Sequence, residues 1–441
     1  MNANPHGAVV PVAEPLLREG VLEAPHNRVV PRGPNPFGEG EGKGAREARR
    51  APPARMERHL AALLPIGSDD ALDEVRLQEL AENASEPNPL FEPWLALPLL
   101  GGRTDVVAVQ VWGCDAGGAR RLDGLLLLER KRVARRLEYL RTWGHLLVPV
   151  GVPLVRAGVE QEVADALLGL VETQALPLLR LDRVPADGPF HRALVHACWL
   201  REWPLHLVDS QTRALFRPLG DAAAFTQEVL SGKRRRELRK ALERLESLGT
   251  VRFTRLESGD AGAVSAWARA YAQLERQGWK GEEGVAVGGA ELDAAQFERI
   301  LRGALMRDRL HFLALEFDGR PVAMNVAVLA GDGGYGLKTT YDESLARFMP
   351  GVQLYLHQLE LLHQTAGLRW MDSCASPDRQ LMNQLWPERR ELHSLVVAAD
   401  RPLASAIAAS LPLTRWAKRW LVDRAPPRAK LRRAQARAEA P

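Results

Sequence analysis

Side chains able to exchange protons lie at the end of the β-rich run from Tyr335 to Tyr341 and just after it. Tyr341 and the adjacent Asp342 are a phenol and a carboxylate, groups that donate and accept protons in catalysis. Core packing is the alternative for Tyr341, and capping of the next turn is the alternative for Asp342. Asp372, at the end of a later β-rich run, is a third catalytic candidate, with a turn or helix cap as its alternative.

The segment that follows Asp342 predicts an anion site. A Pro-Gly pair at 350–351 precedes an amphipathic run that predicts a helix over 353–365. The first N–H groups of a helix have no partner within it, so a helix start attracts anions. The expected anion contacts are Arg347, Met349, Gly351 and Val352.

A Gly-rich loop over 278–289 contains a tryptophan and a lysine, and long loops often carry function. Lys280 is expected to contact a phosphate or carboxylate of a substrate, with a solvated lysine as the alternative. Lys338 lies in the run that ends at Tyr341, where alternate residues face opposite sides of a strand. The candidate substrate contacts are therefore Trp279, Lys280, Lys338 and Glu275.

Hydrophobic periodicity predicts two units that share one order of elements: three strands, helix, strand, helix, strand. We therefore predict an α/β (α+β) fold with two tandem domains, at 56–220 and 250–398. Each is expected to hold a mixed, mostly antiparallel, twisted sheet flanked by helices. The expected strands are 105–113, 122–130, 137–147, 178–184, 205–208, 214–216, 251–256, 311–317, 321–329, 335–341, 368–373 and 392–398. The expected helices are 69–84, 159–174, 190–201, 261–277, 292–307, 353–365 and 380–385.

Residues 221–249 join the two units, and their leucines fall at helical spacing, which predicts one basic amphipathic helix. Its KRRRELRK run is either a solvated face or a contact with tRNA or another phosphate-rich partner. Residues 1–55 and 425–441 are poor in aromatics, which predicts disordered tails. Residues 399–424 are expected to form a terminal helical segment.

Composition narrows the class of protein. A length of 441 residues and a hydrophobic fraction of 46% suit two domains with sizeable cores. The three cysteines and the histidines lack disulfide or metal spacing, so we expect no metal and a cytoplasmic protein. A run of about 18 apolar residues is missing, so no membrane span is expected. The start of the chain lacks the pattern of a secretory signal.

The order of elements resembles the GNAT acyltransferase fold, in the subgroup with two such folds in tandem. That subgroup includes CelD-like cellulose-biosynthesis acetyltransferases and Fem-type aminoacyl ligases. The resemblance covers about 310 residues and is carried by short motifs at Asn88–Pro93, Arg234–Arg239, Trp279–Gly281, Met349–Gly351, Met371–Asp372 and Asn383–Trp386. It implies an acyl-CoA co-substrate whose acyl group lies against the 335–341 strand. It also implies transfer to nitrogen or oxygen of a sugar, a polysaccharide precursor or a small amine.

One departure from the resembled family concerns its phosphate loop, which there reads [Q/R]xxGx[G/A]. Here Arg347 and Gly351 lie four apart, the second small residue is missing, and Pro350 lacks an N–H. Aminoacyl-tRNA, the donor of Fem-type ligases, is therefore an alternative, although the long coiled-coil insertion of many such ligases is missing. A binding protein without catalysis is a third possibility. The first unit lacks a Pro-Gly or Gly-rich loop, so we expect it to be catalytically silent and to shape the acceptor site.

Overall fold

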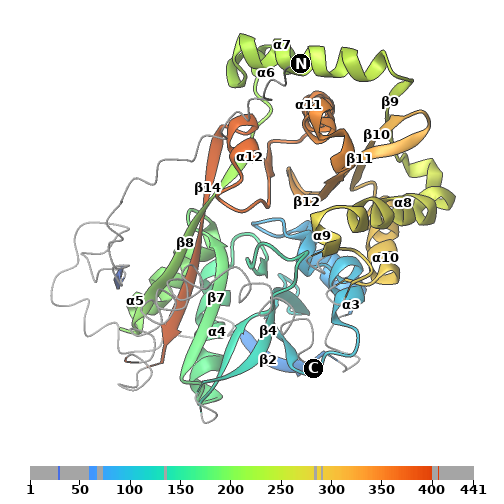
Figure 1. Ribbon diagram of the computed structural model, residues 1–441. Coiled ribbons are helices and arrows are strands. Elements are labelled where there is room, and N and C mark those ends of the chain that lie inside the picture. Colours follow the sequence, from blue (N-terminus) through green and yellow to red (C-terminus); the bar gives the residue numbers. More distant parts are fainter. Residues whose placement is uncertain are drawn as a thin grey trace, which may run out of the picture.

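A computed structural model describes residues 28–29, 59–66, 73–133, 137–282, 286–289, 292–399 and 406. Its strands form one large, twisted sheet with helices on both faces (Figure 1). Along the sheet the order is β2-β3-β4-β5-β7-β14-β8-β13-β12-β11-β10-β9, and most neighbouring strands are antiparallel. The expected α/β class and mostly antiparallel, helix-flanked sheet are therefore confirmed.

The first half of the chain begins with a two-residue strand and ends with a long one. Its elements are β1 (Arg28–Val29), β2 (Leu60–Pro65), α2 (Glu74–Glu82), η1 (Pro89–Phe91), α3 (Pro93–Leu100), β3 (Val106–Cys114), β4 (Arg120–Val133), β5 (Leu137–Thr142), β6 (Leu154–Val155), α4 (Glu160–Thr173), β7 (Leu178–Pro185), α5 (Pro189–Leu200) and β8 (Leu205–Phe216). The elements β2 and α3 were not predicted, and β8 is one strand where two were expected. The start expected for this helix at residue 69 lies outside the described residues, and α2 begins at Glu74 with Asp73 as its N-cap.

The second half begins with two helices of 8 and 15 residues and a strand at the sheet's far edge. Its elements are α6 (Ala222–Val229), α7 (Gly232–Glu246), β9 (Val251–Arg255), η2 (Ser258–Ala263), α8 (Val264–Gln277), α9 (Trp279–Glu282), α10 (Ala294–Leu305), β10 (Leu310–Phe317), β11 (Arg320–Ala330), β12 (Gly333–Tyr341), η3 (Glu343–Phe348), α11 (Pro350–Gln364), β13 (Trp370–Asp372), α12 (Gln380–Leu385) and β14 (Glu388–Ala398).

The linking helix expected over 221–249 is two helices, which corrects that prediction. Leu230 adopts an extended conformation after α6, and the Ser231 side chain accepts a hydrogen bond from the Arg234 N–H at the start of α7. Asp221 caps α6 in the same way. Each helix therefore has its own N-cap, and the leucine spacing that predicted one helix does not extend into α6, which contains no leucine. The expected tails and the segment 399–424 lie almost wholly outside the described residues.

The two halves exchange strands at the centre of the sheet. Strand β14, at the end of the second half, pairs with β7 and β8 of the first half. Strand β13 pairs on one side with β12 and on the other with β8. Each half therefore completes its hydrogen-bond ladder with backbone from the other half.

The hydrophobic core, like the sheet, contains residues of both halves. One face of the sheet packs against α3, α8 and α10 in a single cluster that contains residues of both halves. The opposite face is covered by α4 and α5 in the first half and by α11 and α7 in the second (Figure 1). The sequences of α4, α8 and α10 bury one apolar stripe each, as expected for helices that cover a sheet.

Candidate active site

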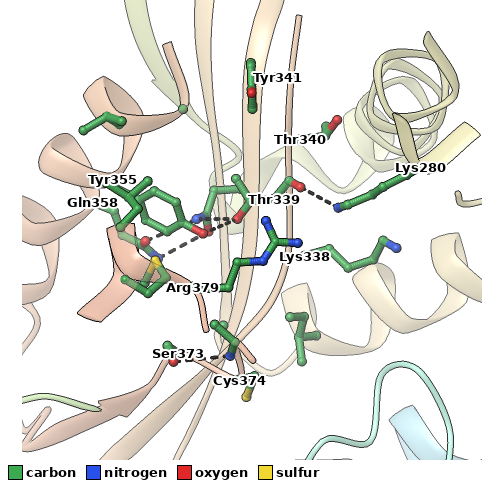
Figure 2. Close-up of a pocket in the computed structure, with 18 of the residues that line it drawn as sticks. Lys280, Lys338, Thr339, Thr340, Tyr341, Tyr355, Gln358, Ser373, Cys374 and Arg379 are labelled. Atoms are coloured by element: carbon green, nitrogen blue, oxygen red, sulfur yellow. Dashed lines mark hydrogen bonds between the residues drawn. The ribbon is translucent and has the colours of Figure 1, made fainter. Parts of the chain in front are cut away.

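A cavity of about 520 Å³ opens where strands β12 and β13 separate. These strands run parallel and are paired only from Gly333 to Tyr335 on β12 and from Trp370 to Asp372 on β13. Beyond Tyr335, the edge of β12 lines the cavity together with the start of α11 and the loop after β13. Figure 2 shows the side chains around this edge.

Backbone groups of β12 face the cavity at alternate residues. The Asp342 N–H donates to the Val322 carbonyl of β11, and the Thr339 carbonyl points the other way and accepts from Lys280 Nζ at 2.7 Å. In an antiparallel ladder, the N–H and the carbonyl of one residue point to the same side. The Thr339 N–H is therefore directed to the open edge, where β13 has already diverged. A donor in this position can stabilise a developing oxyanion.

One side of the open edge is charged. Glu275 is fully buried, and its Oε1 lies 2.8 Å from Lys280 Nζ and 3.0 Å from Lys338 Nζ. The Glu275 carboxylate also accepts from the Tyr271 hydroxyl at 3.3 Å and from the Val287 N–H at 2.8 Å. The structure thus brings together three of the four predicted substrate contacts. The backbone of Trp279 begins α9, and its side chain lies outside the described part of the structure.

The other side of the open edge is neutral. The hydroxyl groups of Thr339 and Tyr355 are 2.7 Å apart, and Asn325 Nδ2 donates to Thr339 Oγ1 at 3.1 Å. Gln358 exchanges two hydrogen bonds with Asn325 and holds that amide in place. Burial raises the pKa of Tyr355, so its phenol is protonated at neutral pH and can donate a proton.

The start of α11 lies at the end of β12. Met349 adopts a left-handed conformation with φ 54° and ψ 46°, which turns the chain into the helix. The Met349 carbonyl accepts from the N–H groups of Val352 and Gln353, and Gly351 packs beside the Tyr341 ring. Of the predicted anion contacts, Met349, Gly351 and Val352 line the cavity. Arg347 is placed apart, with its guanidinium 4.7 Å from the Phe348 ring centre.

The three predicted catalytic residues are separated by the structure. Tyr341 lines the cavity and is partly exposed. Asp342 caps η3 by accepting from the Ser344 N–H and hydroxyl, and it pairs with Arg320 at 3.2 Å. Asp372 is fully buried behind the cavity.

Asp372 belongs to a buried charged cluster between the halves. Its Oδ1 accepts from the Cys374 N–H at 2.8 Å, and its Oδ2 lies 3.6 Å from Arg390 Nη1 and 3.9 Å from Arg213 Nη1. Arg213 also donates to the Pro149 carbonyl of the first half. Burial raises the pKa of the Cys374 thiol well above its usual value, so this cavity-lining cysteine is not a thiolate at neutral pH.

Four further residues line the cavity and were not predicted from the sequence: Thr339, Tyr355, Arg379 and Leu146. A signal for Tyr355 existed, because Gly351, Tyr355 and Gln358 fall four and seven apart and share one helix face. Leu146 lies in the first half of the chain and had no such signal. Its place in the cavity depends on the Arg183 and Arg213 side chains, which donate to the carbonyls of the loop at 148–149.

The structure also bears on metal and membrane binding. In the described ranges, no three His, Cys, Asp or Glu side chains are grouped in a way that could hold a metal ion. Among the same residues, no helix has the length and apolar character needed to cross a membrane.

The chain is similar to known proteins in sequence over one region and in fold over most of its length. Residues 232–380 match the family of Acetyltransferase (GNAT) domains. The crystal structure of FemX superposes with a TM-score of 0.52 at 12% identity, over 76% of this chain and 98% of that chain. L-PGS from Bacillus licheniformis gives a TM-score of 0.47 at 14% identity, over 78% and 97%. A tandem GNAT protein from the clavulanic acid biosynthesis pathway gives 0.38 at 15% identity, over 77% and 99%. No curated protein sequence matches the chain. The likeness to FemX thus shows a shared fold, and residues 232–380 are similar to GNAT acetyltransferase domains.

Proposed function

We propose that the protein is an acyltransferase that moves an acyl group from acyl-CoA to nitrogen or oxygen of an acceptor. The observation that carries this proposal is the open edge of β12, with the Thr339 N–H directed into a cavity that begins at the start of α11. A sugar, a polysaccharide precursor or a small amine is the acceptor class, in line with the resemblance to CelD-like proteins. The reaction would take place in the cytoplasm.

The donor would lie along β12, with its phosphates at the start of α11. Met349, Gly351 and Val352 would contact the donor directly, and Arg347 would add positive charge from the side of η3. The thioester carbonyl would then accept a hydrogen bond from the Thr339 N–H, which stabilises negative charge on that oxygen during attack.

The chemical step needs one proton to be moved. The acceptor amine or hydroxyl attacks the thioester carbon, the carbon–sulfur bond breaks, and CoA leaves as a thiolate. The Tyr355 hydroxyl protonates the thiolate, and the proton lost by the acceptor restores the phenol. Tyr341 stands at the mouth as a second acid–base group.

Asp342 and Asp372 act in this proposal by holding the walls of the site. Asp342 fixes η3, which leads into the donor-binding turn. Asp372 fixes the loop that contains Cys374 and, through Arg213, is tied to the first-half loop that carries Leu146. The first half would thereby shape the acceptor site without taking part in the chemistry.

Calorimetric titration with acetyl-CoA and longer acyl-CoAs tests the proposal. A Cβ at Gly351 would lie 3.4 Å from the Tyr341 ring, so Gly351→Trp fills the cavity mouth and is expected to abolish binding. Arg347→Ala is expected to weaken it. Gly259→Trp is the matched control, because Gly259 is exposed and a Cβ there meets nothing within 4 Å. Absence of heat with every acyl-CoA would contradict the proposal. Binding of acyl-CoA by the Gly351→Trp variant with the affinity of the unaltered protein would also contradict it.

Aminoacyl-tRNA is a second candidate donor, and one observation favours it. Lys233, Arg236, Lys240 and Arg244 are exposed at spacings of three, four and four residues along α7, so they form one stripe about 16 Å long. Within the described residues, no carboxylate forms an ion pair with them. Binding of tRNA through this stripe predicts a log–log salt slope of about −3 to −4. Unchanged affinity after charge reversal at Lys240 would remove this candidate.

A further inference from the structure

Two amide side chains are buried between the sheet and α11, beside the open edge of β12. Asn325 of β11 is 3% exposed, Gln358 of α11 is 2% exposed, and both border the cavity. Asn325 Nδ2 donates to Gln358 Oε1, and Gln358 Nε2 donates to Asn325 Oδ1, each at 3.3 Å. Burial of an amide costs free energy, and an apolar pair of the same shape would avoid that cost. Packing alone therefore does not explain this pair.

The second N–H of the Asn325 amide is directed at the strand that lines the cavity. Asn325 Nδ2 donates to Thr339 Oγ1 at 3.1 Å, and Thr339 Oγ1 lies 2.7 Å from the Tyr355 hydroxyl oxygen. Figure 2 shows Tyr355 and Gln358 extending from α11 toward Thr339. A hydroxyl has one proton and two lone pairs. The Thr339 hydroxyl can therefore accept from Asn325 and still donate its own proton to Tyr355.

The surroundings of the two hydroxyls decide which of them donates. Among the described residues, neither hydroxyl has a hydrogen-bond partner beyond those just named. If Tyr355 donated, the Thr339 proton would have no acceptor in this wall. If Thr339 donates, its proton is used, and the Tyr355 proton is left for a molecule in the cavity. Burial raises the pKa of Tyr355, and the hydrogen bond from Thr339 partly opposes that rise.

We propose that Asn325, held by Gln358, is a positioning residue that makes Thr339 donate to Tyr355 and so directs the Tyr355 proton into the cavity. This inference rests on the proposed function for the role of Tyr355 as the acid. The hydrogen bond from Thr339 remains after the proton has left, and it then stabilises the phenolate, because a charged acceptor strengthens a hydrogen bond.

The same arrangement fixes the source of the returning proton. The phenol O–H bond breaks as the S–H bond of CoA forms, which leaves a phenolate at Tyr355. The Asn325 amide at the other end of the chain is a donor that stays protonated at neutral pH, so it supplies no proton through Thr339. The proton that restores the phenol therefore comes from the cavity, where the acceptor loses one from its nitrogen or oxygen.

Infrared spectroscopy of the full chain measures the direction of the hydrogen bond. The C–O stretch of a phenol lies at lower frequency when the oxygen accepts a hydrogen bond than when the phenol only donates, because acceptance weakens the C–O bond. The chain has five tyrosines. Subtraction of the Tyr355→Phe spectrum, with tyrosine isotope-labelled at the hydroxyl-bearing carbon, therefore isolates the Tyr355 band. We expect this band below that of p-cresol that only donates. A band at the donor-only position would overturn the proposal without any further variant.

Replacement of Asn325 by aspartate reverses the chain with little change in size. The carboxylate accepts the Thr339 proton, so Tyr355 must donate to Thr339, and its C–O stretch is expected to rise. Asn83→Asp is the matched control, because Asn83 is exposed just after α2 and the change is the same. Thr339→Val removes the donor and gives the same expected rise if the Asn325 variant does not fold. An unshifted band in both cavity variants would refute the proposed direction.

Turnover distinguishes this inference from the proposed function. Asn325→Asp is expected to lower kcat about tenfold or more and to leave acyl-CoA affinity unchanged, whereas Asn83→Asp should change neither. If the band shifts but the unaltered protein turns over no acyl-CoA, the hydrogen-bond direction stands and the acyltransferase function is rejected. If the band shifts and kcat stays the same in the Asn325 variant, the acyltransferase function stands and the positioning role is rejected.

Discussion

Replacement of Glu275 by glutamine is expected to destabilise the protein strongly. The change keeps the size of the side chain and removes the carboxylate charge that the ammonium groups of both Lys280 and Lys338 contact. Their side chains are 19% and 5% exposed, so water compensates for little of this loss. Loss of one partner from a buried ion pair typically costs about 3–5 kcal/mol. We expect a loss near the middle of that range, because Lys280 keeps its hydrogen bond to the Thr339 carbonyl.

Urea unfolding followed by circular dichroism measures this difference. Glu243→Gln is the matched control, because Glu243 pairs with Arg239 on the exposed face of α7, where such pairs contribute about 0.3–0.5 kcal/mol. We expect the Glu275 variant to lose at least several times more stability than the control. A loss below about 1 kcal/mol would refute it, since it would mean that the two ammonium groups do not depend on this carboxylate. Restoring stability with a second change, Lys338→Met, would support the charge argument.

Three further predictions concern pH, strand exchange and proton transfer. Burial raises the pKa of Glu86 to about 7, so its folded-state pKa lies above the unfolded value. Its contribution to the free energy of unfolding is therefore complete below about pH 4.5 and is lost as the pH rises through 7, by roughly 3 kcal/mol in total. Glu86→Gln should remove that pH dependence from urea unfolding curves measured between pH 5 and 8, and an unchanged slope would contradict it. A chain that ends at residue 387 lacks β14, whose Leu392, Leu395, Val396 and Val397 are buried, at roughly 2 kcal/mol each. It should not fold, and a cooperative unfolding transition in it would show that the strand exchange is dispensable. Tyr355→Phe should lower kcat about a hundredfold and leave acyl-CoA affinity unchanged. Tyr139→Phe, outside the cavity, should change neither kcat nor affinity. Retained turnover in the Tyr355 variant would exclude Tyr355 as the acid.

Local patterns predicted much of the second half. Strands β10, β11 and β12 lie within two residues of their expected bounds, and α12 matches its expected range of 380–385. These segments have strong periodicity and clear turn residues, so local sequence decides their conformation. A helix was expected over 353–365 after a Pro-Gly turn, and α11 begins three residues earlier, so that the Pro-Gly pair forms its first turn. Lys280 and Glu275 were both picked as substrate contacts, although their ion pair with Lys338 was not foreseen.

Long-range pairing explains what the sequence did not reveal. Strand β14 was expected to complete the second sheet, but its partners β8 and β7 lie about 180 and about 210 residues earlier in the chain. The hydrophobic sequence of a strand indicates that the strand is buried, but it does not indicate which neighbouring strands pair with it. Leu146 likewise reaches the cavity through long-range contacts, in a loop whose carbonyls accept hydrogen bonds from Arg183 and Arg213. Asp342 and Asp372 were expected to be catalytic, and the structure places both carboxylates as acceptors of backbone N–H groups. Asp occurs in turns and caps for that reason, so residue type alone did not decide between the two roles.

The most direct test of the central claim is hydrogen exchange of the intact protein with and without acetyl-CoA, resolved to short peptides. A donor that lies along the open edge of β12 would occupy the Thr339 N–H and the first turn of α11. The account predicts slower exchange in peptides that cover 336–341 and 349–353, with little change in α7. Protection confined to α7, or no protection in either segment at saturating acetyl-CoA, would contradict the assignment of this edge as the donor site.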